Sequence, residues 1–203
     1  MNEPRPEQPD GAGLLEAMRR RRVTREFLDE PVSTADLETV IRAARWASSA
    51  GNRRIHRFLV IRSLETIQRL KPFAPGILGN PPALIVVSTD ITRAQAEHVQ
   101  LDRDMNSWID VGTALMSMML ACEALGLGSC PATSFSQAAV SRALALPESL
   151  VPELILQIGY PTSRGPRRGS GVTRPTAAEL TDWEEAVGQR EPAADDADAP
   201  ALS

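Results

Sequence analysis

The stretch Met18-Arg19-Arg20-Arg21-Arg22-Val23-Thr24-Arg25-Glu26-Phe27 places five arginines within seven residues of a chain whose formal net charge is -4. Guanidinium groups at this density repel one another unless water or an anion lies among them. Arginine forks match phosphate oxygens two at a time and stay charged at any working pH. The stretch by itself fits two interpretations: a phosphate-binding segment, or a solvated basic helix end that the helix dipole favours.

The composition around this stretch is that of an ordinary globular domain. A length of 203 residues fits one domain, and a hydrophobic content of 42% is enough for a sizeable core. The negative net charge argues against a nucleic-acid-binding protein, because a basic surface normally dominates such a domain. No apolar run follows a charged start, and the longest one, Val111 to Cys122, is about half a membrane span. We therefore expect a cytoplasmic protein with no membrane and no nucleic-acid partner.

The residue types that carry side-chain catalysis are scarce. Cys122 and Cys130 fall in apolar context, which predicts that both are reduced and buried. The histidines are His56 and His98, and no Cys-x-x-Cys is present, so we expect no metal site. The chain also has no Gly-x-Gly-x-x-Gly after a strand, no Walker loop and no Gly-x-Ser-x-Gly elbow. These absences favour an organic cofactor that supplies the chemistry.

The ends of the chain differ in composition from its middle. Residues 1–11 are rich in proline and polar residues and show no apolar period, which predicts a disordered lead. Residues 188–203 are rich in Ala, Asp and Pro, which predicts a disordered acidic tail. We therefore expect one folded domain over residues 12–187.

Hydrophobic periodicity predicts a mixture of helices and strands in this domain. Ser33 and Asp36 have the spacing of a capping box, and an apolar helical face follows them. Short β-rich apolar runs predict buried strands, and further helical patterns lie between them. We expect strands over 58–61, 83–88 and 154–159, helices over 14–18, 64–73 and 136–144, and a polar exposed helix or excursion over 89–106. The predicted fold class is α+β, a small mixed sheet flanked by helices in three layers.

One predicted helix, Trp108 to Leu125, is apolar on nearly every side. Such a helix packs on all sides in a core or lies in a subunit interface. Asp110 lies within it, and a carboxylate in apolar surroundings needs a partner. We expect that partner to be an interface arginine, with catalysis as the minor alternative.

Four segments in order resemble the signatures of the nitroreductase superfamily. The family's Arg-Arg-Ser-x-Arg-x-Phe followed by Pro-Val resembles the segment from Arg21 to Val32. Its Ala-Pro-Ser-x-x-Asn-x-Gln resembles Ala47-Ser48-Ser49-Ala50-Gly51-Asn52-Arg53-Arg54. Its Gly-Leu-Gly resembles the stretch 124–131, and its Gly-Tyr-Pro with a late Arg-Pro resembles 158–161 with Arg174-Pro175. The resemblance covers about residues 14–183.

This resemblance implies an FMN-binding homodimer with the flavin at the interface and the long apolar helix between the subunits. It assigns phosphate and ribityl contacts to the N-terminal arginines and to Arg174, and places the 47–54 segment over the flavin of the partner chain. It also places the backbone of 131–134 against the isoalloxazine ring. The implied cofactor-binding residues are Arg21, Arg22, Val23, Arg25, Ser48, Ser49, Asn52, Arg54, Pro131, Ala132, Thr133, Ser134 and Arg174.

The sequence departs from the family pattern at several of these positions. Val23 replaces a serine, Ser48 replaces a proline and Arg54 replaces a glutamine, while Ile55-His56 stands for the usual Pro-Trp. Arg54 could stabilise negative charge on the reduced flavin or bind a substrate carboxylate, or it could form an interface ion pair. His56 could donate a proton, although a histidine at a strand start is more often only hydrogen-bonded. No residue is assigned as catalytic.

The resemblance implies an FMN-dependent oxidoreductase. We expect ping-pong hydride transfer from NAD(P)H through the flavin to a nitro, quinone or enone acceptor. One alternative follows from Ala74 to Gly79 and Ser129 to Phe135, which resemble the flavin subunit of cyclic dipeptide oxidases. Those enzymes desaturate a small cyclic substrate and work with a small partner subunit. A further alternative is a flavin-binding or assembly subunit without turnover.

Overall fold

The computed structural model describes residues 12–101, 105–162 and 175–181. The chain divides into two compact units, Met1–Arg164 and Gly165–Ser203. In the second unit the described residues form turns, where the Glu179 carboxylate accepts hydrogen bonds from the Thr176 amide and hydroxyl at 2.6 and 2.9 Å. The predicted phosphate contact Arg174, the predicted lead over 1–11 and the predicted tail over 188–203 lie outside the described residues.

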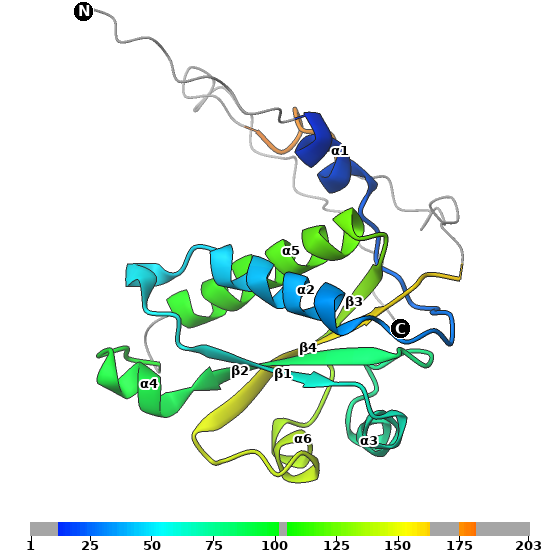
Figure 1. The fold of residues 1–203 in the computed structure, drawn as a ribbon. Coiled ribbons are helices and arrows are strands. Elements are labelled where there is room, and N and C mark those ends of the chain that lie inside the picture. The colour runs from blue at the N-terminus through cyan, green and yellow to red at the C-terminus, as the bar shows by residue number, and fades with distance from the viewer. Residues whose placement is uncertain (1–11, 102–104, 163–174, 182–203) are drawn as a thin grey trace, which may run out of the picture. The chain divides into compact units, whose positions relative to one another are not determined.

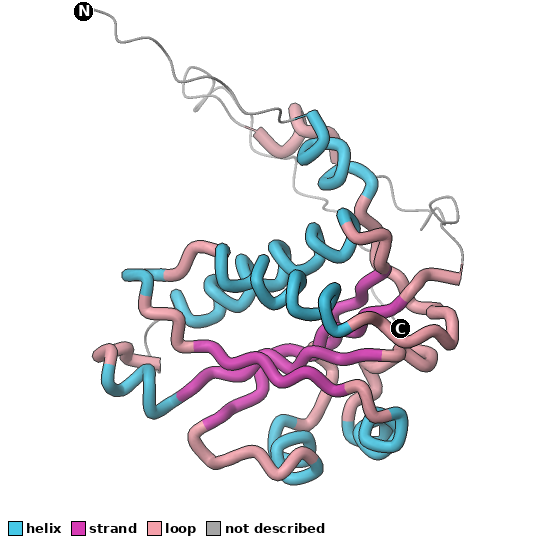
Figure 2. The backbone as a smooth tube through the Cα atoms, in the orientation of Figure 1, coloured by secondary structure: helices cyan, strands magenta, loops and turns pink. Residues whose placement is uncertain are grey.

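The first unit has three layers. A four-stranded sheet has the order β1-β2-β4-β3. The helices α2 and α5 cover one face of it, and α3 and α6 cover the other (Figures 1 and 2). The strands are β1 (His56–Ile61), β2 (Ala83–Asp90), β3 (Gly128–Ala132) and β4 (Leu150–Gly159). The helices are α1 (Ala12–Arg20), α2 (Thr34–Trp46), α3 (Leu64–Leu70), α4 (Ile91–Ala96), α5 (Asn106–Ala124) and α6 (Gln137–Ala143).

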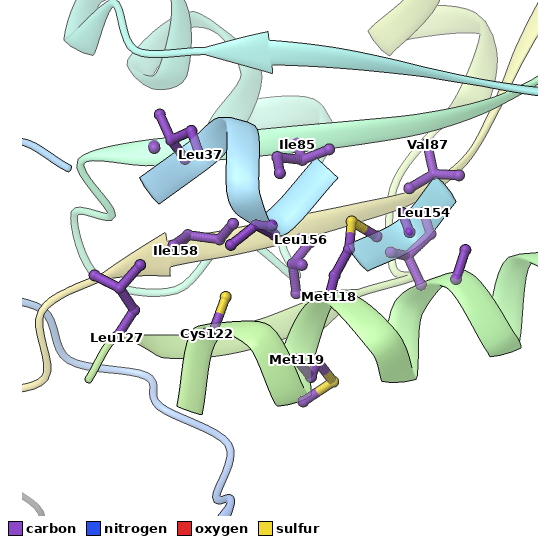
Figure 3. Close-up of a cluster of buried hydrophobic side chains, with 14 of the residues drawn as sticks. Leu37, Ile85, Val87, Met118, Met119, Cys122, Leu127, Leu154, Leu156 and Ile158 are labelled. Carbon is purple, nitrogen blue, oxygen red and sulfur yellow. The ribbon is translucent and has the colours of Figure 1, made fainter. Parts of the chain in front are cut away.

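The central strands β2 and β4 are buried on both faces, which explains their continuous apolar runs. Alternate residues of β2 point to opposite layers: Ile85 and Val87 join the core beneath α2 and α5, whereas Leu84 and Val86 join the core beneath α3 and α6. Figure 3 shows the first of these cores, where the side chains of β2 and β4 meet Met118 and other residues of α5. The predicted α+β fold with three layers is confirmed.

The helix limits follow local capping. The Ser33 hydroxyl accepts a hydrogen bond from the Asp36 amide at 3.0 Å, as the predicted capping box requires. Ser63 and Ser136 cap α3 and α6 in the same way. The predicted apolar helix over 108–125 is confirmed as α5, which buries Met118 and Cys122 but exposes 72% of Trp108.

The sheet corrects three expectations. We expected three strands, but β3 is a fourth, formed by a sequence whose Gly128 and Pro131 are poor strand formers. Pro131 is tolerated because β3 is the last strand of the sheet. The four strands pair only antiparallel, so the sheet is not mixed, although Val23 forms a parallel bridge to Ser129. β2 extends to Asp90, so the expected polar helix over 89–106 is reduced to α4, which ends at Ala96. Residues 102–104 of the expected stretch lie outside the described residues.

No helix in the described parts of the chain combines the length and the apolar character that a membrane crossing requires.

Candidate functional site

The arginine-rich stretch leads into an edge segment, defined here as residues 21–28, which pairs first with β3 and then with the residues that follow β4. The Thr24 amide donates to the Ser129 carbonyl at 2.9 Å, and the Leu28 amide donates to the Tyr160 carbonyl at 2.8 Å. An added Cβ on Gly128 would lie 2.4 Å from the Thr24 hydroxyl, so only glycine lets the two segments approach this closely. Backbone pairing therefore fixes the edge segment beside β3 and the residues that follow β4.

A second loop, residues 74–79, supports this arrangement. Gly79 has a φ of +60°, and a Cβ there would lie 2.8 Å from the Arg25 carbonyl oxygen. The Gly76 amide donates to the Ser134 carbonyl at 3.1 Å. The fully buried Gln157 of β4 holds this loop: its amide accepts from Leu78 N at 2.8 Å and donates to Gly76 O at 3.0 Å and to Cys130 O at 3.3 Å.

The arginines of the stretch differ in their partners. Arg19 is bound to Glu16 at 2.6 Å and Arg20 lies 4.0 Å from Glu123, both with exposed guanidinium groups. Arg22 Nη1 donates to the Arg19 and Arg21 carbonyls. In contrast, Arg21 Nη1 is buried with no hydrogen-bond partner. A buried guanidinium nitrogen without an acceptor is costly, so its position favours the binding of an anion there.

The residues predicted to lie against a flavin ring are at the end of β3, next to the edge segment. Pro131 is half-buried, Ala132 is buried, and Thr133 and Ser134 are exposed. Cys130 precedes them; burial raises the pKa of its thiol, and the nearby charge of Arg25 opposes that shift. The structure therefore places Val23 beside Ser129 and Arg25 near Cys130, next to 131–134. That these residues bind a cofactor stays a prediction.

The other predicted segment is the 47–54 loop, which joins α2 to β1. Gly51, Asn52 and Arg54 have φ values of 60°, 56° and 51°, so three residues of the loop are left-handed. Two of them are not glycine, which is uncommon and is found where surrounding structure fixes the backbone. Arg54 Nε donates to Asn52 Oδ1 at 2.9 Å, and Arg54 Nη1 donates to the Arg45 carbonyl.

Side chains of α5 hold this loop. The Asp110 carboxylate, 7% exposed, accepts the Ala50 amide at 3.0 and 3.2 Å. The Thr113 hydroxyl lies 3.0 Å from the Ser48 carbonyl. Ser49, between these two contacts, has a buried hydroxyl without a partner; it and Arg21 Nη1 are the two such side-chain atoms among the described residues. The partner of Asp110 within the chain is thus a backbone amide, where we expected an interface arginine.

The side chain of His56, at the start of β1, lies near a hydroxyl group and is partly buried. Its Nε2 lies 3.5 Å from the Ser107 hydroxyl. Burial lowers the pKa of the imidazole, while Asp110 and Ser107 act in the opposite direction. These contacts match the hydrogen-bonded interpretation of His56.

The structure does not bring the 47–54 loop to the edge segment of the same chain. The loop contacts α5 at Asp110 and Thr113, whereas the edge segment contacts β3, which follows the end of α5 (Figure 1). From Thr113 to the end of α5 at Ala124 the helix extends about 16 Å. Ser48, Ser49, Asn52 and Arg54 therefore form a second group, separate from the group around Arg21.

Sequence reasoning missed Gln157 and Thr113, which fix these two groups. Gln157 interrupts an apolar strand, and that interruption is a signal that a buried amide has partners elsewhere. Thr113 carries no such signal. Among the described residues, no cluster of three or more His, Cys, Asp or Glu side chains could hold a metal ion.

Comparison with known proteins identifies the family. A sequence model described as "Nitroreductase family" matches residues 18–76 and 74–160. A protein of Archaeoglobus fulgidus with the provisional name NADH dehydrogenase/NAD(P)H nitroreductase is 31% identical over 148 residues, which cover 70% of this chain and 81% of that protein. A Bacillus subtilis protein named FMN reductase (NAD(P)H) is 24% identical over 76% of this chain and 68% of its own length.

Solved structures agree with the sequence comparison. The crystal structure of a nitroreductase family protein from Clostridium difficile has a TM-score of 0.71 and 28% identity, and covers 84% of this chain and 97% of that chain. NfrA1 of B. megaterium, with 23% identity and a TM-score of 0.73, shares the fold. The edge segment, the 47–54 loop and the whole sheet lie within the matched region, and the chain belongs to the nitroreductase family.

Proposed function

We propose that this protein is an FMN-dependent oxidoreductase that takes electrons from NAD(P)H and passes them to a nitro, quinone or enone compound. The observation that carries the proposal is the unpartnered Arg21 Nη1, buried beside β3 in a segment rich in arginine. A phosphate monoester carries nearly two negative charges and offers acceptors that a guanidinium nitrogen matches. The name of the Bacillus subtilis relative adds support for flavin and NAD(P)H.

The residues on this edge suit the rest of the cofactor. Arg21, Arg22 and Arg25 would hold the phosphate, and the backbone of 131–134 would lie along the ring. FMN, when bound, supplies the hydride chemistry. The protein binds and orients it and excludes water, and no side chain is required to donate or accept a proton.

We further propose that the site is completed by a second copy of the chain. Ser49, the other residue with an unpartnered buried atom, lies in the 47–54 loop, which contacts α5 at Thr113, about 16 Å from the end of the helix that leads to β3. A twofold arrangement would place the loop of one copy beside the edge segment of the other. The outer faces of α1 and α5, together with the residue that precedes α5, expose large apolar side chains suited to such an interface: Leu14, Leu15, Met18, Met105, Trp108, Ile109 and Met116.

The alternative with a cyclic substrate uses the same flavin site. The two segments that suggest it are in contact, since the Gly76 amide donates to the Ser134 carbonyl at 3.1 Å. In that version the protein oxidises a small cyclic compound, transfers the electrons to oxygen and works with a small partner subunit.

The visible spectrum of the purified protein tests the proposal. We expect bound FMN, and rapid loss of its absorbance on anaerobic mixing with NADPH or NADH. Flavin whose absorbance is unchanged by both nucleotides but is lost on adding a cyclic dipeptide would favour the alternative with a cyclic substrate. Bound flavin that no donor reduces would indicate an assembly subunit, and a chain that binds no FMN at all would contradict the proposal.

A further inference from the structure

We propose that Asp110 and Thr113 of α5 are positioning residues that fix the 47–54 loop in the conformation that binds FMN. This inference rests on the proposed function, because it assigns a role to the loop in cofactor binding. Neither residue lies in the group around Arg21.

The two residues hold the loop from either side of Ser49. Asp110 accepts the amide of Ala50, the residue after Ser49, at 3.0 and 3.2 Å. The Thr113 hydroxyl faces the carbonyl of Ser48, the residue before it, at 3.0 Å. Because Asp110 and Thr113 are three residues apart on a helix, they lie on the same face, and one turn of α5 binds both sides of the loop.

The contacts from Asp110 and Thr113 matter because the loop has little regular structure of its own. Only the short 3-10 turn Ala50–Asn52 lies within it, and this turn contains two left-handed residues. A segment of this kind, if unattached, would lose conformational freedom when it binds a ligand, and the affinity would fall by that cost. Fixing the backbone on both sides of Ser49 orients its unpartnered hydroxyl in advance.

The same helix offers a matched control. The Ser117 hydroxyl donates to the Thr113 carbonyl at 2.9 Å, one turn further along α5. That bond lies inside the helix and does not reach the loop. Thr113 also lies 3.0 Å from the Asp110 carbonyl, so both hydroxyls make an intrahelical contact and only Thr113 adds the contact to Ser48.

The test compares Thr113→Val with Thr113→Ser and Ser117→Ala. The valine keeps the shape and removes the donor, whereas the serine keeps the hydroxyl. We expect FMN to bind about three- to tenfold more weakly to T113V apoprotein, as loss of one hydrogen bond predicts. T113S and S117A should stay within about twofold of the unchanged protein. Asp110→Asn, which keeps an acceptor oxygen but loses the charge, should weaken binding in the same direction.

A second readout does not depend on FMN. Hydrogen exchange of the Ala50 amide in apoprotein should be faster in T113V than in S117A, because the segment around Ser49 loses one of the two contacts that α5 makes with it. Equal FMN affinity in T113V and S117A, or unchanged exchange at Ala50, would overturn the inference. Failure of the unchanged protein to bind FMN would instead contradict the proposed function, so the two failures can be told apart.

Discussion

The edge segment and the 47–54 loop are held in different ways. Backbone hydrogen bonds and close glycine contacts attach the edge segment to β3 and to the 74–79 loop. Side chains attach the 47–54 loop: Asp110 and Thr113 of α5, and Arg93 of α4, whose Nε donates to the Arg53 carbonyl at 3.1 Å. The edge segment is therefore part of the sheet layer, so its position depends on the fold as a whole. The conformation of the 47–54 loop depends on a few side-chain contacts, so a single substitution can change it.

The largest effect is expected from the arginines of the edge segment. Arg21→Ala combined with Arg25→Ala removes two guanidinium groups from the proposed phosphate site, and charge-assisted hydrogen bonds contribute about 1.5–3 kcal/mol each. FMN binding should weaken at least about a hundredfold, and the purified protein should be colourless.

Arg19→Ala is the matched control, because Arg19 is exposed and already paired with Glu16. Its flavin content should be unchanged. Full flavin occupancy in the double variant would contradict the assignment of the phosphate site.

A substitution of Gln157 tests whether the hydrogen bonds that hold the 74–79 loop beside the edge segment stabilise the fold. Gln157→Leu removes three hydrogen bonds, which join the side chain to the Leu78 amide and to the Gly76 and Cys130 carbonyls. We expect the free energy of unfolding to fall by about 2–4 kcal/mol, measured by urea denaturation. Gln68→Leu, which removes one exposed contact to Asn80, should change it by less than about 0.5 kcal/mol. A Gln157 variant as stable as the Gln68 variant would show that the hydrogen bonds of Gln157 do not stabilise the fold.

Alanine substitutions at Gly79 and Gly51 compare the rigidity of the two regions directly, because both glycines have a φ of +60°. In Gly79→Ala the new Cβ meets the Arg25 backbone oxygen at 2.8 Å, whereas in Gly51→Ala it meets the Arg53 side chain at 3.2 Å. The left-handed conformation costs each variant about 1–2 kcal/mol. Because backbone cannot move aside as a side chain can, the loss of stability should be larger for Gly79→Ala by about 1 kcal/mol. Equal losses would mean that the two regions are equally rigid.

The smallest effect concerns His56 and pH. Burial lowers the pKa of its imidazole below the ordinary value of 6.5, so the unfolded chain binds the proton more readily than the folded one. Its contribution to stability is therefore complete above pH 6.5 and is lost as the pH falls from there towards the folded pKa. Thermal unfolding should show a fall in stability over this range that His56→Gln reduces. The same variant at the exposed His98 should leave the fall unchanged.

Much of the fold could be predicted from local sequence. The cap at Ser33, the buried run of β2 and the apolar pattern of α5 each determine their element within a few residues. β3 could not be predicted, because Gly128 and Pro131 disfavour a strand and only pairing with β4 forms it. Tertiary pairing overrides local propensity at this strand.

The candidate site likewise has a part that the local sequence indicates and a part that it does not. The arginine cluster has a visible chemical signal in the sequence, whereas the pairing of the segment that follows it with β3 is visible only in the structure. The roles of Thr113 and Gln157 depend on contacts with residues 65 and 79 positions away in the chain, namely Ser48 and Leu78. No local pattern indicates such contacts, so they became visible only in the folded chain.

A crystal structure of the protein with FMN tests the central claim most directly. We predict a twofold dimer in which Arg21 of one copy binds the phosphate and Ser49 of the other copy contacts the same flavin. A flavin bound by both residues of a single copy, or a phosphate bound away from Arg21, would contradict the account.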